Sequence, residues 1–159
     1  MWCRAVGGVV TLLLGLLALP FAAEAQQPAK LSRIGFLLAS SPAVVASGIE
    51  AFRQGLRELG YVEGHSIGIE YRYGEGKTER FPALVTELVQ RHVAVLVVDG
   101  ATATRAAKQV TTLIPVVMVN VTDPVAVGLV ASLGRPGGNL TGGSPLSPAL
   151  GVKRLALLK

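Results

Sequence analysis

Cysteine is almost absent from this chain of 159 residues, because Cys3 is the only one and it lies in an N-terminal leader. Once that leader is removed, the remaining chain can form no disulfide and depends on its hydrophobic core for stability. Residues 26–159 are long enough for one domain with such a core. No internal repeat and no low-complexity segment interrupts them.

Runs of one charge are also missing. The chain carries 15 basic and 10 acidic residues, a net charge of +5. Removal of the leader takes away one charge of each sign, Arg4 and Glu24, and leaves this balance unchanged. The basic residues are scattered, and the aromatic side chains that could stack on bases are Tyr61, Tyr71 and Tyr73. This pattern is typical of a solvated surface, and we expect no nucleic-acid partner.

The motifs of several enzyme classes are absent as well. The first strand-like segment is followed by Ala39-Ser40-Ser41-Pro42 and not by the G-x-G-x-x-G of a dinucleotide fold, and no G-x-x-x-x-G-K-[ST] occurs. No serine lies in a nucleophile elbow. His65 and His92 are isolated from any cysteine or carboxylate cluster at metal-ligand spacing. We therefore expect no catalysis, no metal and no cofactor.

Residues 1–25 have the pattern of a cleaved signal peptide. Arg4 provides the positive start, residues 5–19 form an almost unbroken apolar stretch, and Ala23-Glu24-Ala25 provides the small residues of a cleavage site. The sequence predicts cleavage before Gln26 and a periplasmic or secreted mature chain.

A membrane anchor is the rival interpretation of this leader. Spanning a bilayer takes ~20 apolar residues, and residues 5–23 approach that length. The break at Pro20 and the polar Gln26-Gln27-Pro28 that follows favour cleavage over anchoring.

The rest of the chain alternates between strand-like and helix-like segments. The strand-like segments are residues 33–38, 66–72, 93–98, 115–119 and 139–142. The helix-like segments are residues 42–59, 78–91, 102–112, 124–133 and 149–159. Segments 93–98 and 115–119 are apolar throughout, as in strands covered on both faces, whereas 66–72 alternates and suits an edge. The order predicts an α/β domain with a doubly wound parallel sheet of strand order 2-1-3-4-5.

Ligands of such sheets bind beyond the carboxyl ends of the strands. The loops expected there are residues 39–41, 100–102 and 120–123, and each leads to a helix N-terminus with unpaired N–H groups and a positive dipole end. With hydroxyls beside those groups and the carboxylate of Asp123, the set suits a small zwitterion. The candidate ligand-binding residues are Ser40, Ser41, Gly100, Ala101, Thr102, Asn120 and Asp123. Alternatively, Ser41, Thr102 and Asp123 only cap their own helices.

Several segments resemble one protein family, in order and over nearly the whole mature chain. They include AFRQGLRELGYVEG at residues 51–64 and RPGGNLTG at residues 135–142. The others are residues 34–37, 69–72, 106–109, 114–117, 123–125 and 128–133. These segments are similar to the ABC-transporter substrate-binding proteins of the tryptophan/tyrosine type.

The resemblance implies a type I periplasmic-binding fold, in which two similar lobes close on a ligand that is then handed to a membrane permease. On this basis residues 26–143 are expected to form the N-terminal ligand-binding lobe. Residues 144–159 are expected to form the crossover and the start of a second lobe. The segment Gly100-Ala101-Thr102-Ala103 departs from the family pattern, which has a hydroxyl one place earlier.

The resulting hypothesis is an extracytoplasmic solute-binding component of an ABC uptake transporter, with amino acids among the candidate solutes. An exported sensory or interaction domain of the same fold is the alternative, and an extracytoplasmic enzyme is a weaker third. One lobe alone offers half of the ligand contacts, so we expect it to bind very weakly. An aromatic solute would need a stacking partner, which the three loops do not contain.

Overall fold

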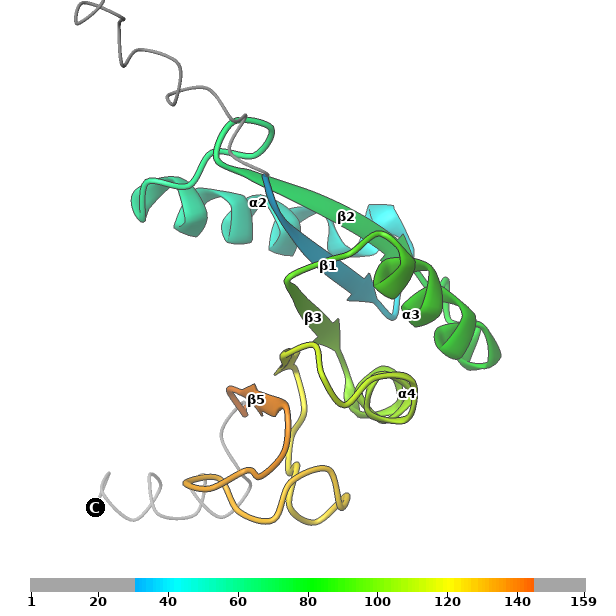
Figure 1. Ribbon diagram of the computed structural model, residues 1–159. Helices are drawn as coiled ribbons and strands as arrows, with labels where there is room; N and C mark the ends of the chain where they lie inside the picture. Colours follow the sequence, from blue (N-terminus) through cyan, green and yellow to red (C-terminus); the bar gives the residue numbers. More distant parts are fainter. Residues whose placement is uncertain (1–30, 145–159) are drawn as a thin grey trace, which may run out of the picture. The chain divides into compact units, whose positions relative to one another are not determined.

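The computed structural model describes residues 31–144, and the sheet they form has the predicted strand order. The expected signal peptide and the expected helix at residues 149–159 lie outside the described residues. The strands are β1 (Ser32–Leu38), β2 (Ile67–Tyr73), β3 (Val95–Asp99), β4 (Val116–Val119) and β5 (Leu140–Gly142). They are arranged as β2-β1-β3-β4-β5 with every pairing parallel, which confirms the doubly wound α/β fold (Figure 1).

Helices cover both faces of this sheet. They are α2 (Pro42–Glu58), the short 3-10 helix η1 (Thr78–Arg80), α3 (Phe81–Gln90) and α4 (Ala101–Val110). Helix α2 lies along one face, and α3 and α4 lie on the other (Figure 1). None of the helices within residues 31–144 has the length and apolarity needed to cross a membrane.

The larger core lies between the sheet and helices α3 and α4. Alternate residues of the strands point to this side. Those that are completely buried include Leu37 of β1, Leu96 and Val98 of β3, and Val116 of β4. Val85 and Leu88 of α3 meet them from the helix layer. Because side chains alternate along a strand, the residues between these positions face α2.

A smaller core lies under α2. Phe36, Val97 and the helix residue Ile49 are buried there, and Phe52 packs edge-on against Phe36 with the ring centroids 5.1 Å apart. Gly60 ends the helical segment as expected, with φ of 83° and its N–H donating to the carbonyl of Arg57.

The helix expected at residues 124–133 does not form. The N–H of Val127 donates to the carbonyl of Asp123 at 3.2 Å, which closes one helical turn. Gly128 then takes φ of 71° and ends it. A left-handed glycine stops an α-helix, so Pro124 opens a single turn and residues beyond it are irregular.

The larger core predicts a measurable cost for truncation at Leu96, which is completely buried. Leu96→Ala is expected to lower the free energy of unfolding by about 2–5 kcal/mol in chemical denaturation, since it removes apolar contacts and leaves a cavity. Leu113→Ala is the matched control, because Leu113 is 89% exposed, and should stay within about 0.5 kcal/mol. Equal losses for the two variants would contradict this account of the core.

Candidate functional site

The strand register brings the three candidate loops to one edge of the sheet. Val98 pairs with Leu37, and Asp99 pairs with Val119, so β1, β3 and β4 end almost level. Residues 39–41, 100–102 and 120–123 leave these strands at that edge, which is called the strand-end edge from here on. The structure thus brings together the segments that hold all the candidate ligand-binding residues.

Two helix N-termini at the strand-end edge lack a side-chain cap. Ser41 is the N-cap residue of α2, yet its hydroxyl makes no capping hydrogen bond. Gly100 is the N-cap of α4, with φ of 86°, and has no side chain to cap with. Thr102 lies within the first turn of α4 and is exposed. The capping-only interpretation is therefore wrong for Ser41 and Thr102.

Asp123 does cap. Its carboxylate Oδ1 accepts a hydrogen bond from the N–H of Ala126 at 2.9 Å, which satisfies one donor of the turn that Pro124 opens. The capping interpretation is confirmed for this residue, and a contact of Asp123 with ligand stays a prediction.

Asp99 and Asn120 form a pair at the strand-end edge that the sequence analysis did not identify. The side-chain Nδ2 of Asn120 donates to Oδ1 of Asp99 at 2.8 Å. Asn120 has φ of 55°, and the N–H of Gly100 donates to the carbonyl of Val119 beside it. In the sequence, Asp99 directly follows an apolar run and directly precedes a glycine, and this pattern could have identified it as a candidate.

An apolar groove of about 460 Å³ starts at this pair and extends between α2 and the sheet. Its lining residues are Phe36, Leu38, Val44, Val45, Ser47, Gly48, Ile49, Phe52, Val97, Asp99, Val117, Val119 and Asn120. Asn120 is the only candidate ligand-binding residue among them, and Asp99 is the only charged one. Two aromatic side chains are present, although neither comes from the candidate loops.

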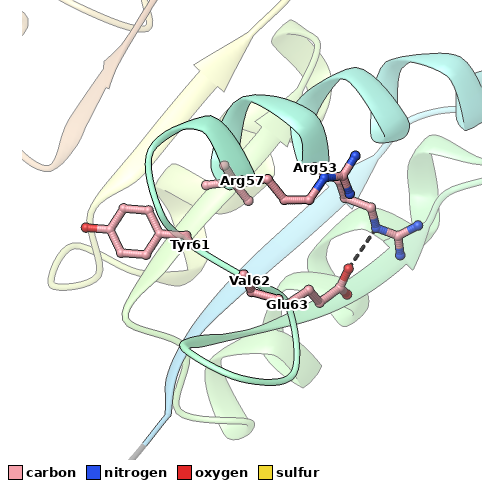
Figure 2. A pocket seen from close by; sticks show the side chains of 6 residues that line it. Arg53, Arg57, Tyr61, Val62 and Glu63 are labelled. Carbon is pink, nitrogen blue, oxygen red and sulfur yellow. Dashed lines mark hydrogen bonds and ion pairs between the residues drawn. The ribbon is translucent and has the colours of Figure 1, made fainter.

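A second, smaller cavity of about 120 Å³ lies at the C-terminal half of α2 (Figure 2). Nε of Arg53 donates to Oε2 of Glu63 at 2.7 Å across it, and Arg57 and Tyr61 complete the rim. Because α2 starts at the strand-end edge, its C-terminal half lies away from the candidate site. The ion pair ties the α2–β2 connection to the helix and is half-exposed, which limits its contribution to stability.

The side chain of Tyr71 packs against the core under α2, and its buried hydroxyl finds no hydrogen-bond partner among residues 31–144. The guanidinium carbon of Arg53 lies 5.2 Å from the centroid of the Tyr71 ring. Burial raises the pKa of Tyr71 above its ordinary value of 10.0, and the negative charge of Glu63 adds to the effect. Both causes disfavour the phenolate in the folded chain.

This environment predicts that Tyr71→Phe preserves or increases stability, because it removes a buried polar atom without a partner. Above about pH 10 the unfolded tyrosine ionises while the folded one resists. The free energy of unfolding of the wild type should therefore fall as the pH rises through this range, and that of Tyr71→Phe should fall less. Denaturant unfolding at pH 8 and pH 10.5 measures both effects. Tyr61→Phe, at an exposed residue, is the control, and a clear loss of stability at Tyr71→Phe would contradict the prediction.

Within residues 31–144, no group of three His, Cys, Asp or Glu side chains is arranged to hold a metal ion.

A family model described as ABC transporter substrate binding protein matches residues 38–159. The tyrosine-binding protein of Clostridioides difficile strain R20291 is 32% identical over 95 residues, which cover 60% of this chain and 28% of that protein.

Solved structures of similar fold come from two further bacteria. A conserved domain protein from Vibrio cholerae O1 biovar eltor has a TM-score of 0.70 and 28% identity, covering 80% of this chain and 43% of its own. An ABC domain from Streptococcus pneumonia, solved in complex with L-Trp, has a TM-score of 0.65 and 30% identity, covering 75% of this chain and 40% of its own. This chain therefore spans less than half the length of each of these relatives.

Proposed function

Because the chain belongs to the ABC transporter substrate-binding protein family, we propose that it is an extracytoplasmic solute-binding protein that serves the membrane permease of an ABC uptake transporter. The observation that carries the proposal is the strand-end edge, where three loops and two uncapped helix N-termini meet beside an apolar groove. Clefts of this kind, apolar with a few convergent polar groups, are typical of small-molecule sites.

The solute that suits this edge is a small amino acid with an apolar side chain. The positive dipole ends at the starts of α2 and α4 favour a carboxylate. The hydroxyls of Ser40 and Ser41 lie in the loop before α2, and that of Thr102 lies in the first turn of α4. The carboxylates at this edge, Asp99 and Asp123, supply negative charge for an ammonium group. Relatives support this class of solute, since one is named a tyrosine-binding protein and another was solved with L-Trp.

We further propose that residues 31–144 form one of two lobes that close around the solute. The matched structures are more than twice as long as the part that aligns with them. A closed cleft surrounds its ligand and excludes water, whereas one lobe leaves the ligand half solvated. The affinity of the 159-residue chain by itself should consequently be low.

Titration of the ¹⁵N-labelled chain with L-tryptophan tests the proposal. Amide shifts are expected in residues 39–41, 100–102 and 120–123, with a Kd of about 1 mM or weaker. Sucrose at the same concentrations is the control and should leave these amides unchanged. If no strand-end amide responds to millimolar L-tryptophan, the proposed solute site is wrong. Micromolar affinity would instead show that one lobe suffices.

The extracytoplasmic location is tested separately through the leader. Expression of the full chain in a Gram-negative host should yield a periplasmic product that begins at Gln26, as read by intact mass. Ala25→Leu should block processing, because the peptidase pocket accepts only a small residue there. Ala22→Leu, outside the Ala23-Glu24-Ala25 site, is the control and should be processed. Unprocessed wild-type chain in the membrane fraction would favour the anchor instead.

A further inference from the structure

Asp99 is a carboxylate at the end of an apolar groove. It is half-buried and makes no ion pair with any of residues 31–144. Its hydrogen bond comes from the neutral amide of Asn120, so none of these residues balances its negative charge. A half-buried charge loses hydration, and a cation at this point would recover that loss.

The register shows why this charge belongs to the groove. Leu96 and Val98 of β3 are buried in the core of α3 and α4, whereas Val97 belongs to the core under α2. By the alternation of a strand, Asp99 shares the face of Val97. It pairs with Val119 of β4, and both residues line the groove together with Leu38.

Asn120 orients the carboxylate. Its backbone is left-handed, with φ of 55°, a conformation that asparagine tolerates better than most residues. In that conformation its side chain reaches back across the edge to Oδ1 of Asp99. The hydrogen bond fixes Oδ1, and Oδ2 accepts no hydrogen bond from the described part of the chain, residues 31–144.

From this geometry we infer that Asp99, positioned by Asn120, binds the cationic amine of the solute, and that the apolar groove takes the solute's apolar part. The inference rests on the proposed solute-binding function and assigns the two recognition elements within it. The groove volume of about 460 Å³ lies in the range of small-ligand sites. The walls also supply Phe36 and Phe52, the aromatic faces that the loops lack.

Charge selects this occupant over a packed apolar helix. Such a helix would cover Asp99 with apolar surface and leave the carboxylate desolvated without a partner. A second copy of the chain carries basic residues of its own, so that occupant is tested through the oligomeric state. A small molecule with an amine at one end and an apolar body matches both ends of the groove.

Three related probes separate the two recognition elements in titrations of the ¹⁵N-labelled 159-residue chain. L-tryptophan carries both charges, tryptamine lacks the carboxylate, and indole-3-propionate lacks the amine. Asp99→Asn keeps the shape and an acceptor for Asn120, and should weaken L-tryptophan and tryptamine at least ~10-fold because a charge-assisted hydrogen bond is lost. Indole-3-propionate should bind the variant no more weakly than it binds wild type. Glu79→Gln removes the same charge at an exposed residue and should change nothing.

Asn120→Gly tests the positioning role, because glycine keeps the left-handed backbone while the amide is removed. It should weaken the two amine probes by an intermediate factor of ~3, less than Asp99→Asn does. Equal binding of all three probes before and after this substitution would remove Asn120 from the inference.

Gly48→Leu tests the groove itself. A Cβ at Gly48 meets no atom within 4 Å, so leucine can be added from α2 without strain and will fill part of the groove. All three probes should bind more weakly. Gly55→Leu is the matched control, since its Cβ position on α2 is also open and Gly55 does not line the groove.

The outcomes separate this inference from the proposed function. If the strand-end amides respond to L-tryptophan but Asp99→Asn binds tryptamine as wild type does, the inference is wrong and the proposed function stands. If no probe binds, both the inference and the proposed solute site are wrong. Sedimentation velocity tests the other occupant, a second copy of the chain. A dimer of the 159-residue chain that Gly48→Leu dissociates would identify the groove as a self-association surface and overturn the inference.

Discussion

Parallel pairing of the strands is the constraint on which the rest of this structure depends. When neighbouring strands run in the same direction, their carboxyl ends must lie at the same edge, and each crossover helix must begin near that edge. The pairing therefore gathers loops that are far apart in the sequence, residues 39–41 with residues 120–123, at one strand-end edge. It also aims the positive ends of α2 and α4 at the same space. Parallel pairing therefore brings the candidate loops together before any particular side chain is considered.

The two faces of the sheet differ in how completely they are packed, and this difference creates the groove. Two helices, α3 and α4, fill one face, so Leu96, Val98 and their neighbours are sealed. Of the helices within residues 31–144, α2 alone covers the other face, and Val117 and Val119 of β4 are only half-buried there. The open half of this second face is continuous with the strand-end edge. Consequently apolar surface and polar strand ends meet in one place.

Much of the fold could be predicted from the sequence because hydrophobic periodicity reports on burial. Uninterrupted apolar runs identified β3 and β4 as central strands, and alternation identified β2 as an edge strand. The prediction of a helix at residues 124–133 was wrong. Asp123 and Pro124 indicate where a helix begins but not how far it continues, and the left-handed glycine Gly128 ends it after one turn. The site was predicted less completely. The sequence indicates which residues belong to a strand-end loop. The face of the sheet to which the last strand residue points depends on the strand register, which the sequence does not show.

Asp99 illustrates that limit and explains the chemistry available at the edge. In the sequence it is one carboxylate after an apolar run, and a shift of one residue in the strand would turn it toward α3 and α4. The observed register instead places it on the face that α2 covers, beside Leu38 and Val119. A carboxylate in the core of α3 and α4 would have needed a permanent partner from the protein itself. On the face of α2 it lines a groove, where a cation from solution can reach it.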